Sequence, residues 1–179
     1  MGVNHIAIAV KDIEATHRFY TEAMGFELVK VQIVPKGESF SRHVFYTTGS
    51  ARDQMIAFWD LSRVSDPEAL RTDICRDLGL APGTNHLAFS ASDVPDLMRR
   101  KERWLARGHD VLEIDHGWIH SIYTEDPDGI TVEFAVLTQD FTERDAAEAL
   151  ELLRAEHPAP SERPRRIELH KASARAGAA

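Results

Sequence analysis

The chain has 179 residues, of which 43% are hydrophobic and 28% charged, a composition typical of a folded globular protein. Its 21 Lys and Arg against 29 Asp and Glu give a net charge of −8, which argues against a nucleic-acid partner and against an anionic membrane surface. The single cysteine, Cys75, excludes an intrachain disulfide, and the lack of a signal pattern or a long apolar run predicts a cytoplasmic protein.

Two segments of the sequence resemble each other. Residues 3–13 read VNHIAIAVKDI and residues 84–94 read TNHLAFSASDV, so Asn, His, Ala and Asp recur in register. Each copy is strand-like, and a helical stretch follows it, over 14–24 in the first half and 96–107 in the second. A glycine comes directly after each helical stretch, which is a common helix stop.

Three strand-like runs follow each predicted helix. They span 27–34, 42–47 and 54–59 in the first half, and 110–114, 118–124 and 130–136 in the second. The sequence therefore predicts an α+β fold of two βαβββ modules, the first over residues 1–61 and the second over residues 84–137. A polar segment, 62–83, is predicted to link them.

The region after the second module has a different character. Residues 138–156 contain a helical pattern, so we predict a C-terminal helix there. Residues 157–179 hold three prolines together with several arginines and alanines, and we predict a flexible tail without a core of its own.

Strand parity puts both repeated histidines on faces of small side chains. Side chains alternate along a strand, so His5 shares a face with Ala7 and Ala9, and His86 shares one with Ala88 and Ser90. The bulky apolar residues lie on the opposite faces, which are suited to packing under a helix. The faces that carry the histidines leave room for a cavity.

A carboxylate lies in the middle of the last strand-like run. Glu133 shares a face with Thr131 and Ala135, and burying it is costly unless it is paired or bound to a cation. Two histidines and one carboxylate on the inner face of a curved sheet form a triad that holds Fe(II) and related ions with open positions. Taken singly, His5 and His86 also fit core histidines, and Glu133 fits a solvent-facing residue. Their repeated positions favour the triad.

The duplicated Asn-His strand, the helix ending in glycine, and the Asp-Pro-Asp-Gly turn at 126–129 before Glu133 resemble the vicinal oxygen chelate superfamily. This superfamily includes glyoxalase I, bleomycin-resistance proteins and extradiol dioxygenases, and the resemblance covers residues 1–137. It implies a curved, incomplete barrel around a divalent metal held by His5, His86 and Glu133. The implied ion is Fe2+, with Mn2+, Ni2+ or Zn2+ as alternatives.

The stretch from His116 through Tyr123 to Glu133 resembles the signature of type I extradiol dioxygenases. That resemblance implies that Tyr123 and His116 contact a bound catecholate, and that the substrate is an aromatic vicinal diol. Gln54 stands near the place where many of these enzymes carry an acid–base histidine, although an amide can only hydrogen-bond. His43, on the neighbouring strand, is a candidate substitute. We therefore predict an Fe(II)-dependent ring-cleaving dioxygenase with Tyr123, His116 and Gln54 as its catalytic residues.

Aromatic side chains are candidates for a substrate pocket. Phe58 and Trp118, together with His43, fit this role, although such residues also serve as ordinary core. A glyoxalase I of the usual kind fits less well, because that branch carries a fourth ligand, a glutamate, where Ala57 and Phe58 stand here.

Two other functions remain open. One is a glyoxalase-like lyase, isomerase or epimerase on the same triad, and the other is a non-catalytic, drug-binding resistance protein. Since members of the superfamily often form dimers, we also expect a homodimer that binds a small molecule and has no nucleic-acid or membrane partner.

Overall fold

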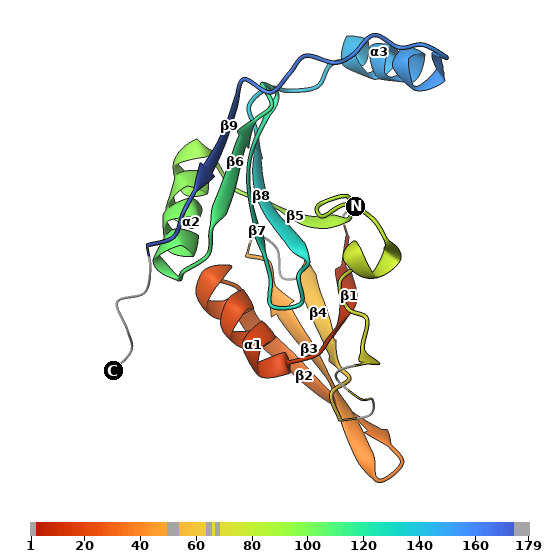
Figure 1. The fold of residues 1–179 in the computed structure, drawn as a ribbon, viewed down its shortest axis with the longest axis vertical. Helices are drawn as coiled ribbons and strands as arrows, with labels where there is room; N and C mark the ends of the chain where they lie inside the picture. The colour runs from red at the N-terminus through yellow and green to blue at the C-terminus, as the bar shows by residue number, and fades with distance from the viewer. Residues whose placement is uncertain (1–2, 50–53, 64–65, 67–68, 174–179) are drawn as a thin grey trace.

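The computed structural model describes residues 3–49, 54–63, 66 and 69–173. Its strands and helices follow the predicted order (Figure 1). The first module contains β1 (His5–Val10), α1 (Ile13–Arg18), a π-helical turn η1 (Phe19–Ala23), β2 (Glu27–Lys36), β3 (Ser39–Thr47) and β4 (Met55–Asp60). The linker contains the 3-10 turn η3 (Arg76–Leu78). The second module contains β5 (His86–Ser90), α2 (Val94–Ala106), β6 (Val111–Asp115), β7 (Ile119–Glu125) and β8 (Thr131–Leu137), and α3 (Glu143–Arg154) and β9 (Arg166–His170) follow it.

The two predicted βαβββ modules are confirmed. One sheet has the strand order β1-β4-β3-β2 and the other has the order β5-β8-β7-β6-β9. In each module the first and last strands pair in parallel, and the helix and the two middle strands connect them. The fold is α+β, and its two sheets do not close into a barrel. None of the described helices is long and apolar enough to cross a membrane.

The repeated aspartates begin the two helices. Asp12 caps α1 and Asp93 caps α2: the Asp12 carboxylate accepts hydrogen bonds from two backbone N–H groups of the first turn, and the Asp93 carboxylate accepts one. Gly25, with a φ of 76°, ends the first helical segment. A Cβ at this position would collide with the guanidinium of Arg103 from α2, so a side chain here would displace the end of the arginine.

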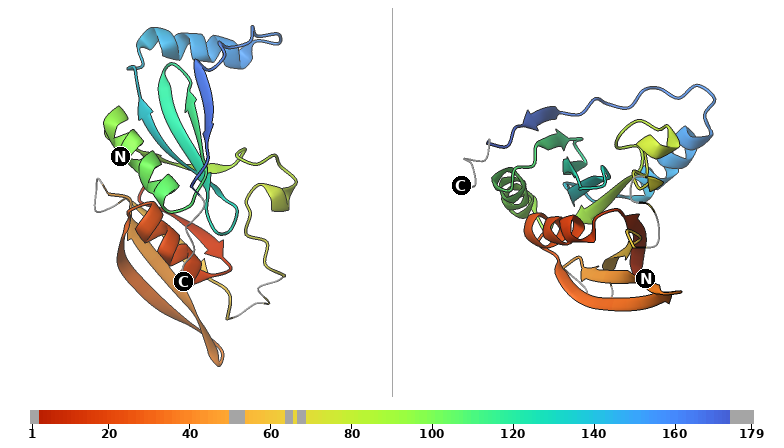
Figure 2. Two further views of the ribbon diagram at one scale, coloured as in Figure 1. Left: turned by 60° about the vertical axis from the view of Figure 1, so that its left-hand side comes forward. Right: turned by 60° about the horizontal axis from the view of Figure 1, so that its bottom comes forward.

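Both modules share one core. Helices α1 and α2 lie side by side on the same side of the molecule (Figures 1 and 2). The Phe26 ring, just after the first helical segment, lies 5.0 Å from that of Phe89 in β5 and 6.1 Å from that of Phe134 in β8. Trp104 of α2 is fully buried against Phe134. Since the helices cover only one face of each sheet, the opposite faces, here called the open faces, stay uncovered within one chain.

The Asp-Pro-Asp-Gly turn ties the second module to the first. The Asp128 carboxylate accepts a 2.6 Å hydrogen bond from Thr72 in the linker and a 3.1 Å bond from the backbone N–H of Lys11, between β1 and α1. Asp126 accepts one from the Tyr20 hydroxyl at 3.1 Å. The turn therefore fixes the position of β8, and so of Glu133, relative to the first module.

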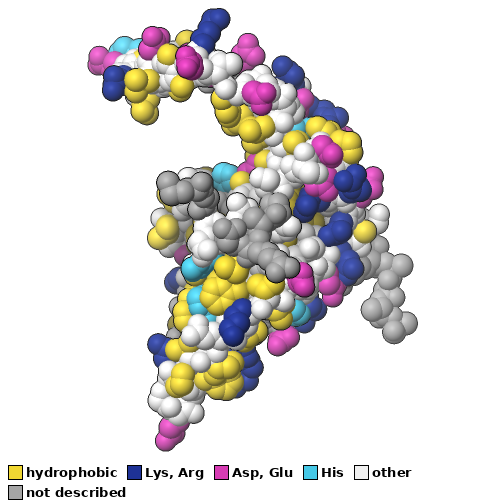
Figure 3. Space-filling view, turned by 180° about the vertical axis from the view of Figure 1, so that it is seen from behind, with side chains coloured by type: hydrophobic (Ala, Val, Ile, Leu, Met, Phe, Trp, Pro, Cys, Tyr) yellow, Lys and Arg dark blue, Asp and Glu magenta, His cyan; other side chains and the backbone are white. Residues whose placement is uncertain are grey.

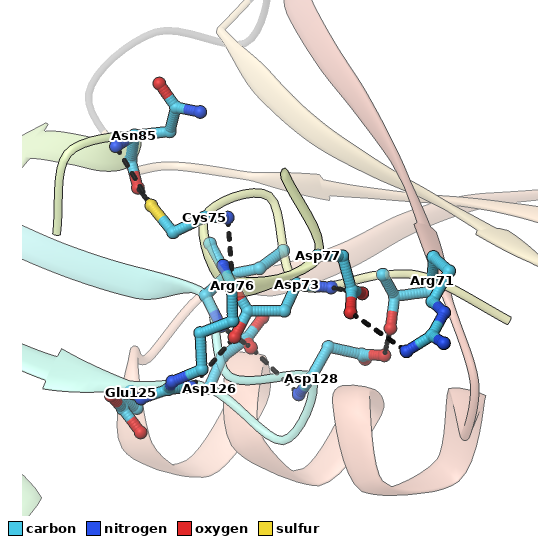
Figure 4. A network of polar contacts seen from close by, with 11 residues as sticks. Arg71, Asp73, Cys75, Arg76, Asp77, Asn85, Glu125, Asp126 and Asp128 are labelled. Carbon is cyan, nitrogen blue, oxygen red and sulfur yellow. Dashed lines mark hydrogen bonds and ion pairs between the residues drawn. The ribbon is translucent and has the colours of Figure 1, made fainter. Parts of the chain in front are cut away.

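Linker residues form a polar network beside this turn (Figure 4). Arg76 lies 2.8 Å from Asp73 and 2.6 Å from Glu125 of β7. Gly129, with a φ of +85°, leaves no room for a side chain, because a Cβ would lie 2.8 Å from an Asp73 carboxylate oxygen. These contacts fasten the part of the linker around residues 72–76 to the second module.

The C-terminal region departs from the prediction. The tail predicted for 157–179 contains β9, which pairs antiparallel with β6 and extends the second sheet. Residues 174–179 lie outside the described part of the chain. Helix α3 is present as predicted, capped by Thr142, but it projects from the end of the molecule and buries none of its residues (Figure 1).

Candidate metal centre

His86 and Glu133 lie side by side on the open face of the second sheet. Ala88 of β5 pairs with Glu133 of β8, which places His86, two residues earlier, on the same face. The His86 Nε2 atom is 3.0 Å from a Glu133 carboxylate oxygen. The Glu133 side chain is 5% exposed and that of His86 is 37% exposed, so the carboxylate is buried while the imidazole still reaches solvent.

The chemistry of this pair fits a cation. The His86 Nδ1 atom lies 2.9 Å from the carbonyl oxygen of Gly83, so Nδ1 must carry a proton and donate it. In the neutral imidazole, Nε2 then presents a lone pair to the Glu133 carboxylate, and two acceptors 3.0 Å apart need a cation between them. A proton on Nε2 or a divalent metal ion would serve, and a carbonyl-oriented imidazole beside a carboxylate is a common metal-ligand arrangement.

Tyr123 borders the pair. It lies directly opposite Glu133 in the β7–β8 ladder, and its ring centroid is 6.1 Å from that of His86. Burial, together with the negative charge of Glu133, raises the pKa of the Tyr123 phenol above its usual value. The phenol therefore stays protonated at neutral pH and can donate a hydrogen bond to a ligand at the pair.

His5 lies on the other sheet. It begins β1, an edge strand, and its exposed ring contacts Asn4 at 2.8 Å and Phe45 at a centroid distance of 5.8 Å. Among the described residues, His5 forms no group with His86 and Glu133 in which all ligand atoms lie within 4.8 Å of one another. One chain thus brings two of the three predicted ligands together, and the complete triad remains a prediction.

Aromatic side chains accompany His5 on the open face of the first sheet. The strand register puts His43, Phe45 and Trp59 on this face, and the His43 ring stacks on Trp59 with a centroid distance of 3.8 Å. Burial lowers the pKa of His43, and its buried Nε2 has no hydrogen-bond partner in the described part of the chain. Figure 3 shows histidine and hydrophobic side chains gathered over this module. A ligand-binding role for His43 stays a prediction.

Other predicted site residues lie away from the His86–Glu133 pair. Phe58 is fully buried in the core, 4.4 Å from the Tyr20 ring, so the prediction that it lines a pocket is wrong. Trp118 is in the β6–β7 turn, where it packs on Phe141 before α3. Gln54 precedes β4, and its carbonyl accepts a hydrogen bond from Thr48.

His116 does not lie beside Tyr123. It is in the β6–β7 turn, where its backbone N–H binds the Ile119 carbonyl. Tyr123 pairs with Leu112, which precedes His116 by four residues, or about 13 Å along a strand. The register therefore separates the two residues that the dioxygenase signature would bring to one substrate.

Glu113, Glu168 and His170 form a second candidate cluster, which sequence reasoning missed. Among the residues that the structure describes, these three side chains form a group in which one ligand atom of each lies within 4.8 Å of those of the other two. The buried Glu113 carboxylate already binds Lys101 and His170 at 2.8 Å, and His120 at 2.8 Å. Burial alone would raise the pKa of Glu113, but hydrogen bonds from Lys101 and His120 lower it to about 2.

Charge balance identifies this cluster as an ion-pair network. Arg166 also binds Glu113, so the cationic Lys101 and Arg166 compensate the two carboxylates, and a metal ion would have to displace them. The sequence signal is a glutamate, Glu113, within the predicted strand 110–114, with alternating ionic residues in the predicted tail.

The comparisons with known proteins identify relatives over most of the chain. Residues 2–134 match the family model described as the Glyoxalase/Bleomycin resistance protein/Dioxygenase superfamily. Proteins named lactoylglutathione lyase, from serogroup A and serogroup B strains of Neisseria meningitidis, are each 27% identical over 140 residues, which cover 75% of this chain and 89% of the relative.

Solved structures of low sequence identity share the fold. A glyoxylase/bleomycin resistance protein/dioxygenase domain from Frankia sp. EAN1pec matches with a TM-score of 0.57 at 20% identity, covering 76% of this chain and 98% of that one. The fosfomycin resistance protein FosX from Listeria monocytogenes, solved with Mn(II) and sulfate, matches with a TM-score of 0.53 at 20% identity, covering 82% and 97%.

These relatives correct the predicted activity. The curated relatives are lactoylglutathione lyases, which contradicts the prediction of a ring-cleaving dioxygenase for an aromatic diol. The alternative of a glyoxalase-like enzyme agrees with them better. The dioxygenase signature misled because the Asp-Pro-Asp-Gly turn and the following glutamate are common to the whole superfamily, and the register separates His116 from Tyr123.

Proposed function

Because this chain belongs to the glyoxalase/bleomycin resistance protein/dioxygenase superfamily, we propose that it is a metal-dependent, glyoxalase-like lyase or isomerase. Its substrate would be a small molecule with two neighbouring oxygen atoms. The observation that carries the proposal is the His86–Glu133 pair, two metal-ligand side chains 3.0 Å apart on an open sheet face. The lactoylglutathione lyase relatives, at 27% identity, support this reaction class.

The residues of the pair have distinct tasks in this proposal. A bound divalent ion would act as a Lewis acid toward the two substrate oxygens. His86 and Glu133 would hold the ion, and the Gly83 carbonyl keeps the His86 imidazole in the tautomer that binds metal. The protonated Tyr123 phenol would donate a hydrogen bond to a substrate oxygen and so orient it.

We further propose that His5 of a second copy completes the triad. The accessible surface of the chain is 11843 Å², whereas a folded monomer of 20.1 kDa has about 8,700 Å². The excess, about 3,000 Å², includes the surface of α3, which buries none of its residues, and that of the two open faces, one with His5 and one with the His86–Glu133 pair. Covering the open faces would bury an area in the range of a stable dimer interface. A homodimer that lays one face over the other would bring the three ligands together.

Metal binding tests the proposal directly. Purified protein stripped with a chelator should bind Zn2+ or Ni2+ in isothermal titration calorimetry. Replacing a direct ligand, as in Glu133→Gln or His86→Ala, should weaken binding at least about 100-fold, more than the loss of an outer-shell partner does. His116→Ala, in the β6–β7 turn, is the matched control and should bind the ion as the wild type does.

An activity assay on the metal-loaded and the stripped protein provides the second test. The metal-loaded wild type should isomerise hemithioacetals that methylglyoxal or phenylglyoxal forms with a thiol, and the stripped protein should not. A wild type that binds neither ion would contradict the proposal. Ligand binding that persists unchanged in chelator would favour the drug-binding alternative.

A further inference from the structure

A cavity of about 780 Å³ opens on the same sheet face as the His86–Glu133 pair. His86 and Tyr123 line one end of it, and Leu112, Ile114 and Leu169 line another part. The last of these belongs to β9, which lies beyond the residues 2–134 that match the family. The cavity therefore includes a wall that this chain adds to the shared fold.

The strand register connects the metal-ligand pair to this wall. Glu133, Tyr123, Leu112 and Leu169 lie directly opposite one another in successive strands, so they form a row across the open face. At about 4.8 Å per strand, Leu169 is about 14 Å from Glu133. Ile167 pairs with Ile114 on the same face, two residues along β9. The row is therefore ionic at Glu133 and aliphatic at Leu112 and Leu169, the two residues farthest from the pair.

Strand β9 has two different faces. Arg166 and His170 face the helix side of the sheet and bind the buried Glu113. Leu169 and Ile167 face the open side, where they are 57% and 62% exposed. Anchoring on one face thus holds an exposed aliphatic row in place on the other.

The charges of the cavity do not favour an anionic ligand. Its lining carboxylates, Asp110 and Glu125, are each paired 2.6 Å from a cation, Lys171 and Arg76 respectively. None of the described lining residues is a lysine or an arginine. A glutathione conjugate, with its two peptide carboxylates, would find no uncommitted cation in this lining.

We propose that the substrate carries, beside its two chelating oxygens, an uncharged aliphatic or aromatic group that lies against Leu112, Ile114 and Leu169. The inference rests on the proposed function, because it takes the His86–Glu133 pair as the metal end of the cavity. It distinguishes this chain from enzymes that hold the glutathione part of a conjugate by its charges.

Two hydroxamic acids test this directly, since both present the same pair of oxygens to a metal. Acetohydroxamic acid carries a methyl group, and octanohydroxamic acid carries a heptyl chain that reaches toward Leu169. Each buried methylene strengthens binding about fourfold, so three of them give about sixtyfold. Calorimetry on the Zn2+-loaded protein should show octanohydroxamate binding tighter by about this factor.

Matched variants locate the effect. Leu169→Gln should reduce octanohydroxamate affinity by about fivefold to tenfold and leave that for acetohydroxamate unchanged, because it removes only the aliphatic wall. Leu137→Gln is the control: Leu137 is 54% exposed on β8 but does not line this cavity, and the variant should keep both affinities. Size-exclusion chromatography of each variant shows whether its oligomeric state is that of the wild type.

The outcomes separate the two proposals. Equal affinities for the two hydroxamates on a protein that binds Zn2+ would overturn the apolar subsite and leave the proposed function standing. A Leu169→Gln protein with an altered oligomeric state would also overturn it, since Leu169 would then belong to an interface between copies. A wild type that binds neither Zn2+ nor Ni2+ would overturn the proposed function and this inference together.

Discussion

Asp126 is a buried carboxylic acid, and its ionisation lowers the free energy of unfolding. Burial raises its pKa from the usual 3.8 to about 6, and the neighbouring Asp128 adds to the shift. The folded state therefore favours the protonated form. Its favourable contribution is complete below pH 4 and is lost as the pH rises through about 6. A difference of about two pKa units corresponds to about 3 kcal/mol.

The first prediction concerns this side chain. Asp126→Asn should flatten the pH dependence of stability between pH 4 and pH 7, because the amide keeps an acceptor for the turn and cannot ionise. Wild-type protein should lose most of these roughly 3 kcal/mol over this range, since the unfolded chain ionises this group from about pH 4 and the folded chain only near pH 6. Urea unfolding of both proteins at pH 4, 5, 6 and 7 measures this, and equal slopes against pH would refute it.

Tyr20→Phe tests the same titration from the side of the hydrogen-bond donor. The Tyr20 hydroxyl donates a hydrogen bond to Asp126 and lowers the pKa of its carboxyl. Removing the donor should raise that pKa further and move the loss of stability to higher pH. An unchanged titration would show that this hydrogen bond does not reach the carboxylate in solution.

Site residues could be predicted from sequence where the repeat and strand parity acted together. His86 and Glu133 lie on the predicted face and contact each other. The same parity rule also places Phe58 on the covered face, since it pairs with Val44 and Ile8. Its assignment to a pocket followed aromatic character instead. The prediction for His116 rests on a motif, which carries no information on the register of a hairpin.

At the scale of elements, β9 depends on a single buried carboxylate. Glu113→Gln should release this strand, because Lys101 and Arg166 would lose the anion that compensates them. Breaking a buried pair from one side costs about 3 kcal/mol or more. Hydrogen exchange of the amides at 166–170 should rise at least tenfold in the variant. Unchanged protection there would contradict the anchoring role.

Glu168→Gln provides the comparison within the same strand. Its side chain is 49% exposed and 3.7 Å from its partners, so the substitution should change stability by less than about 0.5 kcal/mol. Equal effects of the two substitutions would show that net charge, and not the buried carboxylate, holds β9.

Most elements could be predicted because their signals are local. The eight module strands show alternation or glycine-bounded apolar runs, and aspartate caps with terminal glycines mark the helices. Strand β9 has only five residues, and its pairing depends on Glu113, more than fifty positions earlier. A local sequence pattern contains no information about a partner so distant in the chain. The prolines before β9 therefore favour the prediction of a flexible tail.

At the scale of the whole molecule, the proposed dimer with shared sites predicts that two inactive variants complement each other when their chains form mixed dimers. His5→Ala and Glu133→Gln chains should each bind little metal alone. Mixed dimers of the two contain one intact site, made from the His5 of one chain and the His86–Glu133 pair of the other. Random mixing should restore about a quarter of wild-type metal binding. Co-expressed proteins with separate tags, analysed for bound Zn2+, provide the measurement.

Two variants in the same chain form the control. When a His5→Ala, Glu133→Gln double variant is mixed with wild type, each site of a mixed dimer should lack one ligand. Only wild-type homodimers should then bind metal, which gives about a quarter of wild-type binding, whereas chains that each form their own triad would give about half. Failure of the single variants to restore any binding would mean that each chain assembles its own triad. Light scattering should then also report a monomer.

The place of β9 at the outer margin of its sheet has a practical consequence. This strand satisfies the backbone groups of β6 that would otherwise face water as a bare edge, and its charged side chains discourage further strands from adding there. A protein shortened to residues 2–134, the part that matches the family, would lack β9 and expose the unpaired edge of β6 next to Leu112 and Ile114. Such a protein should aggregate at high concentration even if its two modules stay folded.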